Sequence, residues 1–213
     1  MNEHEGVIKY RLSFSTGPAV NGDQVREINA WRRILFLLGL IGQDPARYGG
    51  FGFGNVSRRL QRGGNAFVIS GTQTAQLPEL GPEHYSVVTV CDPMRNQLAA
   101  KGPVKPSSEA LTHGAMYQVD HSIQYVFHVH SPDIWRQASR LAIPATAAKV
   151  SYGTPEMANE IAGLLAGANA RQKHMIIMGG HEDGVVAFGA SAEQTGQALI
   201  RYFSQALQLP KNL

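Results

Sequence analysis

Apolar residues recur at helical spacing in two long segments of the chain. The first begins at Asp23, which we expect to be the N-cap, and we expect it to end at Gly39 or Gly42. The second, Ala192 to Leu209, places its apolar residues three and four positions apart. A further helix is expected to begin at Thr154-Pro155, because proline is favoured in the first turn of a helix.

Short runs of strand-forming residues alternate with the expected helices. They cover Ala66 to Ser70, Ser86 to Asp92, Gln124 to His130 and Lys173 to Met178, and further helices are expected over Ser107 to Tyr117 and from Asp133. This interleaving predicts an α/β fold in which helices pack against a sheet. Because the chain has no internal repeat and no long linker, we expect one domain over residues 23–213, preceded by an irregular or extended arm over residues 1–22.

The composition excludes several classes of protein. Of the 213 residues, 43% are hydrophobic, which predicts a packed core rather than disorder. The strongest apolar run, Ile34 to Ile41, is much shorter than the roughly 18–20 residues that cross a bilayer. A net charge of +3 is too weak to indicate nucleic-acid binding but is compatible with a small anionic partner. A single cysteine and an N-terminus without a secretion signal favour a cytoplasmic protein.

Two histidines, His128 and His130, lie in one expected strand. Alternate side chains of a strand point to the same face, so both imidazoles can converge on one metal ion. Such a pair on its own is equally typical of a polar strand end. His181 is a third candidate ligand, because it lies in a glycine-flanked turn between two apolar runs, although an exposed turn histidine is the ordinary interpretation there.

A second group of residues can bind an anion. Ser107, Ser108 and Glu109 lie at an expected helix start, where free backbone amides and two hydroxyls can hold a phosphate. The same three residues also fit a simple capping arrangement. The glycine-rich stretch from Gly49 to Ser57 and the turn from Ile69 to Thr72 offer further open amides. Neither stretch matches a nucleotide-binding motif, which disfavours nucleotide binding.

Taken together and in this order, these segments resemble the class II aldolase/adducin family, which includes fuculose phosphate aldolase, ribulose phosphate epimerase and methylthioribulose phosphate dehydratase. The resemblance runs from about Asp23 to the C-terminal helix. It is carried by Gly54-Asn55-Val56-Ser57-Arg58, Ile69-Ser70-Gly71, the segment from Pro82 to Asp92, Lys105-Pro106-Ser107-Ser108-Glu109 with His113 and Tyr117, and the segment from Val126 to Pro132.

The resemblance implies a three-layer αβα sandwich with a mainly antiparallel central sheet, and usually a ring-like homotetramer with active sites between neighbouring subunits. It implies a divalent metal ion, often zinc, held by His128, His130 and a third ligand from a later turn. It gives Glu109 the role of moving a proton or completing the metal shell. The positions that match a substrate phosphate site are Asn55, Ser70, Gly71, Ser107 and Ser108.

The chain departs from the family pattern at the third ligand and at the phosphate turn. Family members usually have a histidine directly before the glycine of the following strand, whereas here Asp183 precedes Gly184 and His181 lies two residues earlier. We expect His181 to be the third ligand, with the extra residues absorbed as a bulge, and Asp183 to be the alternative. The turn around Ser70 lacks the usual Pro-Ser/Thr pair, and Tyr152 lies in the region where an active-site aromatic is found.

We therefore expect a metal-dependent lyase of the aldolase type, which cleaves a C–C bond next to a carbonyl in a small hydroxy-carbonyl compound such as a sugar phosphate. The ion, zinc or alternatively manganese, would stabilise the enediolate as a Lewis acid, and Glu109 would move the proton. An epimerase, a dehydratase or a decarboxylase on the same scaffold is an alternative. A non-catalytic, adducin-like interaction domain is another, which the retained His128, His130 and Glu109 disfavour.

Overall fold

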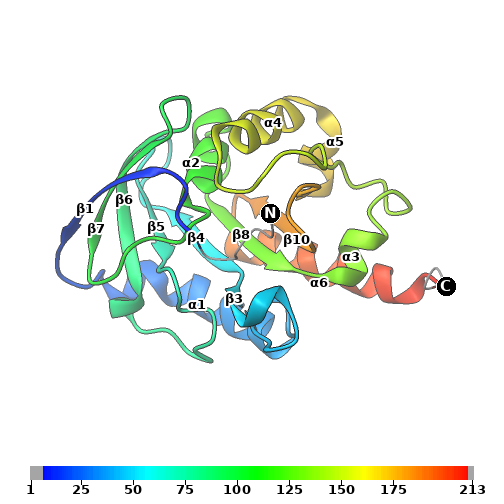
Figure 1. The fold of residues 1–213 in the computed structure, drawn as a ribbon, viewed down its shortest axis with the longest axis horizontal. Helices are drawn as coiled ribbons and strands as arrows, with labels where there is room; N and C mark the ends of the chain where they lie inside the picture. The colour runs from blue at the N-terminus through cyan, green and yellow to red at the C-terminus, as the bar shows by residue number, and fades with distance from the viewer. Residues whose placement is uncertain (1–6, 211–213) are drawn as a thin grey trace.

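An eight-stranded sheet forms the centre of the protein in the computed structural model, which describes residues 7–210 (Figure 1). Its strands are β1 (Arg11–Thr16), β4 (Asn55–Arg59), β5 (Phe67–Ser70), β6 (Tyr85–Asp92), β7 (Gln97–Gly102), β8 (Tyr125–His130), β9 (Met175–Ile177) and β10 (Gly184–Gly189). They lie in the order β1-β7-β6-β5-β4-β8-β10-β9. Each neighbouring pair is antiparallel except β1 and β7, which are parallel. A separate ladder pairs β2 (Gly42–Gln43) with β3 (Gly52–Phe53).

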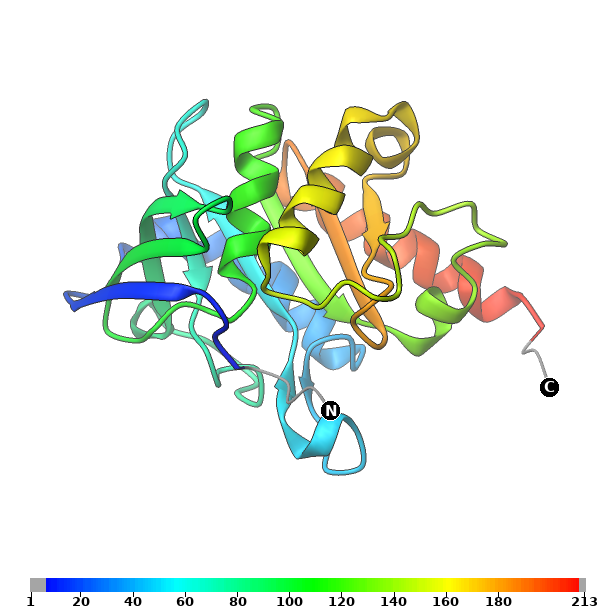
Figure 2. The same ribbon diagram turned by 45° about the horizontal axis from the view of Figure 1, so that its top comes forward.

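Helices cover both faces of the sheet. One layer contains α1 (Gly22–Leu37), α3 (Pro132–Arg136) and α6 (Ala192–Gln208), and the other contains α2 (Ala110–Val119), α4 (Pro155–Ala166) and α5 (Ala168–Lys173). Figure 2 shows α2 and α4 in front of the sheet and α1 and α6 behind it. Each layer buries its own apolar cluster against the sheet. The expected three-layer αβα sandwich with a mainly antiparallel sheet is therefore confirmed.

Strand β8 lies near the centre of the sheet, between β4 and β10. Its residues alternate between the two apolar clusters: Phe127 and Val129 pack in the α1 and α6 layer, whereas Val126 packs in the α2 and α4 layer. Because alternate strand residues share a face, His128 and His130 point to the same side as Val126. The α2 and α4 layer is therefore the layer that can bring further side chains to these histidines.

Two helix starts differ from the sequence expectation. The N-cap of α1 is Asn21, not Asp23, because the Asn21 side chain accepts from the amide of Asp23 while Gln24 accepts from the amide of Asn21. Helix α2 begins at Ala110 rather than at Ser107. Its N-cap is Glu109, and the amide of Ser107, two residues earlier, donates 3.1 Å to the carbonyl of Ser70 and so holds this segment against the end of β5.

The expected N-terminal arm contributes a strand to the central sheet. Residues 11–16 of the arm form β1 at the edge of the sheet, whereas residues 1–6 lie outside the described part of the chain. Strands β4 and β7 were also absent from the expected elements, because they are less regularly apolar than β5, β6 or β8. Among the helices within residues 7–210, none combines the length and the apolar character needed to cross a membrane.

Candidate metal centre

Three buried histidines meet at the end of β8. His128 and His130 come from β8 itself, and His181 comes from the turn between β9 and β10. One ring nitrogen from each can be chosen so that all three lie within 4.8 Å of one another. Their ring centroids are 5.0, 5.1 and 4.6 Å apart. The structure therefore brings the three expected ligands together in an arrangement that suits one metal ion.

The orientation of His128 fits a metal ligand. Its Nδ1 lies 3.3 Å from the carbonyl oxygen of Val185, to which it donates. Its Nε2 is buried and has no hydrogen-bond partner among the residues that the structure describes. Metal-ligating histidines commonly donate their second nitrogen to a carbonyl in this way, which fixes the ring and leaves the other nitrogen for the ion.

Burial also selects the protonation state that a metal requires. It lowers the pKa of both His128 and His130 well below the ordinary value, and the neighbouring His181 lowers both further. Both imidazoles are therefore neutral at physiological pH. A neutral imidazole is the form that coordinates a metal ion, so the charge state agrees with the geometry.

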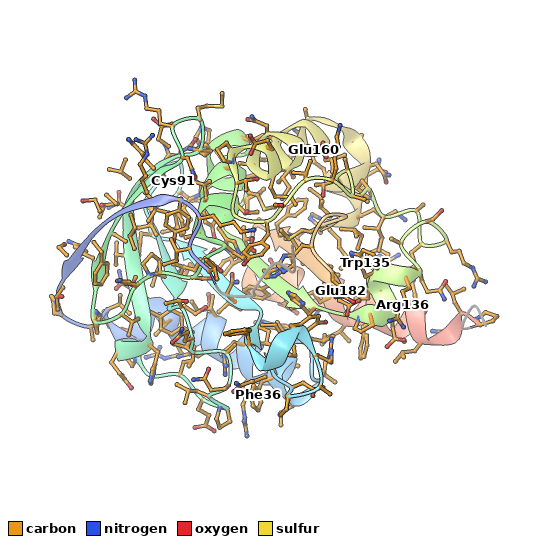
Figure 3. All side chains as sticks on the ribbon, in the orientation of Figure 1. Phe36, Cys91, Trp135, Arg136, Glu160 and Glu182 are labelled. Atoms are coloured by element: carbon orange, nitrogen blue, oxygen red, sulfur yellow. The ribbon has the colours of Figure 1, made fainter. Side chains whose placement is uncertain are left out.

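The turn that carries His181 is held close to a neighbouring backbone segment. A Cβ atom on Gly179 would lie 2.2 Å from the carbonyl oxygen of Thr146, and one on Gly180 would lie 2.0 Å from that of Val150. Glycine is therefore required at both positions. The Nε1 of Trp135 in α3, a residue labelled in Figure 3, donates 3.2 Å to the carbonyl of Met178. These contacts direct the turn so that His181 faces β8.

Asp183, the alternative third ligand, is engaged elsewhere. Its Oδ2 accepts a 2.7 Å hydrogen bond from the hydroxyl of Tyr48 and lies 3.7 Å from the guanidinium of Arg47. Its φ is 60°, a left-handed conformation that lets the turn close before β10. The group of three side chains whose geometry suits a metal ion contains His181 and not Asp183.

Glu109 lies beside this group of histidines. It is the N-cap residue of α2, its side chain is 1% exposed, and its Oε1 lies 3.5 Å from the Nδ1 of His181. The Tyr152 ring stacks on the His181 ring, with the two centroids 4.5 Å apart. Glu109 and Tyr152, both singled out from the sequence, thus lie next to the same histidine.

A small pocket adjoins the histidines. Asn55 lines it and is paired in register with His128, so the pocket and the histidines share the β4–β8 ladder. Its lining residues are Gly52, Gly54, Asn55, Gly71, Thr72, Gln73, Ala75, Ser107 and Ser108. Four of the five expected phosphate-site residues therefore lie here. Ser70 is not among the lining residues, because its hydroxyl accepts a 3.1 Å hydrogen bond from the amide of Val56.

A buried hydrogen-bond network fixes α2 to the sheet. The Oγ of Ser57 on β4 lies 2.7 Å from the Nδ1 of His113 and 2.7 Å from the hydroxyl of Tyr117, both on α2. Burial lowers the pKa of His113 to about 3, so this imidazole is neutral. The network joins the strand that carries Asn55 to the helix whose N-cap is Glu109.

Three residues near the site had no sequence signal, and a fourth, Arg47, had only its charge and its place before the glycine-rich stretch to suggest that it could steer an anionic substrate. The ring of Tyr48 packs edge-on against His130 with centroids 4.5 Å apart, and Arg47 lies beside it. From the N-terminal segment, the Nζ of Lys9 lies 3.8 Å from the centre of the Tyr152 ring. The hydroxyl of Tyr10 donates 2.8 Å to the carbonyl of Ser107. These residues lie in loops or, for Tyr48, in a single 3-10 turn, and no local pattern predicts the positions of such segments.

Comparison with protein-family models gives a match that includes the three histidines and Glu109. The family model described as "Class II Aldolase and Adducin N-terminal domain" matches residues 46–206. A search of curated proteins found no match.

Several solved structures share the fold. YgbL from Klebsiella pneumoniae is 20% identical, with 88% of this chain and 89% of that chain covered and a TM-score of 0.62. A sugar-phosphate aldolase from Thermotoga maritima is 15% identical, with 90% and 97% covered and a TM-score of 0.66. An L-fuculose-1-phosphate aldolase from Thermus thermophilus is 19% identical, with 90% and 100% covered and a TM-score of 0.56.

Proposed function

The chain belongs to the class II aldolase and adducin family, and on that basis we propose that it is a metal-dependent lyase of the aldolase type. Its reaction would be cleavage of a C–C bond next to a carbonyl in a small hydroxy-carbonyl compound. The observation that carries the proposal is the convergence of His128, His130 and His181 beside the buried carboxylate of Glu109. A non-catalytic interaction domain would have no need to bury these groups together.

We assign His128, His130 and His181 as the ligands of a divalent ion, and zinc as that ion. Three neutral imidazoles are a common ligand set of catalytic zinc, and they leave a position for a substrate oxygen. A bound ion would supply Lewis-acid stabilisation of the negative charge that develops on the substrate carbonyl oxygen. The carbonyl oxygen of Val185 accepts a hydrogen bond from the Nδ1 of His128 and so holds that ring. The Tyr152 ring supports the His181 ring by stacking on it.

Glu109 is the group that we assign to proton transfer. A general base has to lie within reach of the proton that it moves, and the Glu109 carboxylate lies directly beside the histidine group. Its burial excludes bulk water from the carboxylate. The network of Ser57, His113 and Tyr117 holds α2 in position and therefore keeps Glu109 next to His181.

We further propose that the substrate carries a phosphate, which Asn55, Gly71, Ser107 and Ser108 bind in the pocket next to His128. Their amide, hydroxyl and open backbone groups are suitable donors for an oxyanion. Two of the matched structures are aldolases of sugar phosphates, which supports the same substrate class. Ser70 would then support the pocket through the backbone of Val56 rather than contact the phosphate.

The proposed assembly is a homotetramer with active sites between neighbouring subunits, as the family resemblance implies. Light scattering tests it, and a monomer in solution would contradict it.

Metal analysis of the purified, tag-free protein tests the proposed function. We expect about one zinc per chain, lost when His128 and His130 are both changed to Ala. Glu109→Gln should retain the zinc and lose turnover in a screen of sugar phosphates, because the amide cannot accept the proton. A wild-type protein that takes up no metal after reconstitution would refute the lyase and favour the interaction domain.

A further inference from the structure

The loop before β3 brings a cation to the histidine group. The guanidinium of Arg47 lies 4.8 Å from the centre of the Tyr48 ring and 5.0 Å from that of Phe53. The Tyr48 ring in turn packs against His130. Arg47 is thus separated from a candidate metal ligand by one aromatic ring. Its side chain is 29% exposed, so the cation is held in place yet open to solvent.

The contacts of Arg47 position its guanidinium without saturating it. One nitrogen donates to the hydroxyl of Tyr48. The nearest carboxylate oxygen, Oδ2 of Asp183, is 3.7 Å away, which is longer than the about 2.7–2.9 Å of a charge-assisted hydrogen bond. That same oxygen already accepts the Tyr48 hydroxyl. A guanidinium has five donors, and within residues 7–210 the Tyr48 hydroxyl is the one hydrogen-bond acceptor of Arg47, so donors remain for a ligand.

The histidine group therefore has two different neighbours. The pocket of Asn55, Ser107 and Ser108 borders His128 and offers neutral donors. Arg47 lies in the loop before β3, on the far side of the Tyr48 ring from His130, and offers a positive charge. This charge also contributes to the lowered pKa of His130. A solvated surface arginine would be mobile, whereas two aromatic rings and Asp183 restrain this one.

We propose that Arg47 is a specificity-determining residue that binds a carboxylate of the substrate. The inference rests on the proposed function and narrows its substrate class to hydroxy-carbonyl compounds that carry a carboxylate in addition to the oxygens that chelate the ion. The planar fork of a guanidinium pairs with both oxygens of a carboxylate, a match that an ammonium group cannot reproduce. The Tyr48 and Phe53 rings hold this fork one aromatic ring away from His130.

Two hydroxamate probes test the inference on the zinc-loaded protein by titration calorimetry. Acetohydroxamate chelates a metal ion and has no further charge, whereas the monohydroxamate of succinic acid adds a carboxylate to the same chelating group. We expect the wild-type protein to bind the acidic probe about tenfold to a hundredfold more tightly. Arg47→Met should abolish this preference and leave the affinity for acetohydroxamate unchanged, and Arg47→Lys should retain only part of it.

Arg33→Met provides a matched control. The guanidinium of Arg33 also lies over an aromatic ring, 5.9 Å from the centre of Phe36, and 3.8 Å from a carboxylate oxygen of Glu79, but it lies on the outer face of α1. This variant should bind both probes like the wild-type protein. Equal affinity of the wild-type protein for both probes, or an equal loss for both in Arg47→Met, would overturn the role of Arg47.

A failure of the proposed function would give a different result from a failure of the carboxylate specificity alone. If the wild-type protein takes up no zinc, or if the zinc-loaded protein does not bind acetohydroxamate, the metal centre itself is refuted together with the inference that depends on it. Binding of acetohydroxamate without any preference for the acidic probe leaves the metal centre intact and refutes only the carboxylate specificity.

Discussion

The hydroxyl of Tyr48 donates a 2.7 Å hydrogen bond to the Oδ2 of Asp183 and so links two loops that are 135 positions apart in the sequence. One loop contacts His130 through the Tyr48 ring, and the other carries His181 two residues before Asp183. Burial, followed by the hydrogen bond to Asp183, raises the pKa of Tyr48, so the hydroxyl stays protonated and remains a donor at physiological pH. The bond therefore fixes the separation of two candidate ligands.

Tyr48→Phe removes this bond and keeps the ring against His130. Groups that orient metal ligands typically change metal affinity by about 10–100-fold, so we expect zinc affinity to fall by about tenfold in competition with a chromophoric chelator. Tyr125→Phe is the matched control, because the Tyr125 hydroxyl also donates to a carboxylate, that of Glu27, in the opposite helix layer. Equal zinc affinities of wild type and Tyr48→Phe would show that the bond does not position the ligands.

The neutral state of His113 predicts a pH dependence of stability in the metal-free protein. The pKa of His113 is about 3 in the folded protein, below its ordinary value of 6.5, because the imidazole is fully buried. Between these values the unfolded chain binds the extra proton, so the free energy of unfolding falls as pH falls, by about 1.4 kcal/mol per pH unit for this residue.

His113→Asn removes that titration and retains an acceptor for Ser57. Urea unfolding between pH 3 and 6.5 should therefore show a shallower pH dependence for His113→Asn than for the wild-type protein. His128 and His130 contribute equally to the pH dependence of stability in both proteins, so their contributions cancel when the two slopes are compared. The same slope in both proteins would mean that His113 is not held neutral by the fold.

Gly180 is predicted to be irreplaceable in the turn that carries His181. A Cβ atom there would lie 2.0 Å from the carbonyl oxygen of Val150, so Gly180→Ala has to displace the turn or the backbone next to it. We expect a loss of stability of about 2–4 kcal/mol and a loss of zinc binding, measured by thermal unfolding and elemental analysis.

Gly163→Ala is the control for this substitution. Gly163 lies within α4, where an added Cβ has no heavy atom within 4 Å, and alanine is the better helix former. The variant should gain about 0.5–1 kcal/mol of stability and bind zinc normally. Normal zinc binding by Gly180→Ala would contradict the proposed role of the turn.

Ser108 in the small pocket and Ser70 beside it are expected to respond differently to substitution by alanine. Ser108 lines the pocket, so Ser108→Ala should raise the dissociation constant for inorganic phosphate by about three- to tenfold, measured by calorimetry. Ser70 accepts a hydrogen bond from the amide of Val56, so Ser70→Ala should lower stability by about 1–2 kcal/mol and leave phosphate affinity unchanged. The reverse pattern would place Ser70, not Ser108, at the anion.

Local patterns determined most elements of this protein. The apolar spacing of α6 predicted both of its ends within one residue, the proline at position 155 predicted the start of α4, and the strand-forming runs predicted β5, β6 and β8. The alternation of strand side chains also put His128 and His130 on one face, as observed. These features follow from the repeat of the backbone itself, so a few neighbouring residues are enough to specify them.

Strand β4 shows why other elements were missed. It contains Ser57 and Arg59, whose polar side chains are buried because distant groups satisfy them. Ser57 bonds to His113 and Tyr117, and the Nε of Arg59 donates 2.8 Å to the carbonyl of Ile123. A polar run that depends on such partners does not look like a buried strand in the sequence.

The candidate site depended on tertiary structure in the same way. From the sequence, His181 and Asp183 were both candidates for the third ligand, and only the contacts of Asp183 with Tyr48 and Arg47 distinguish them. The sequence therefore determined the elements and the residue types of the site, because these depend on short-range periodicity and side-chain chemistry. Which side chains meet was decided by the packing of loops and layers that lie more than a hundred residues apart, and no local pattern records those contacts.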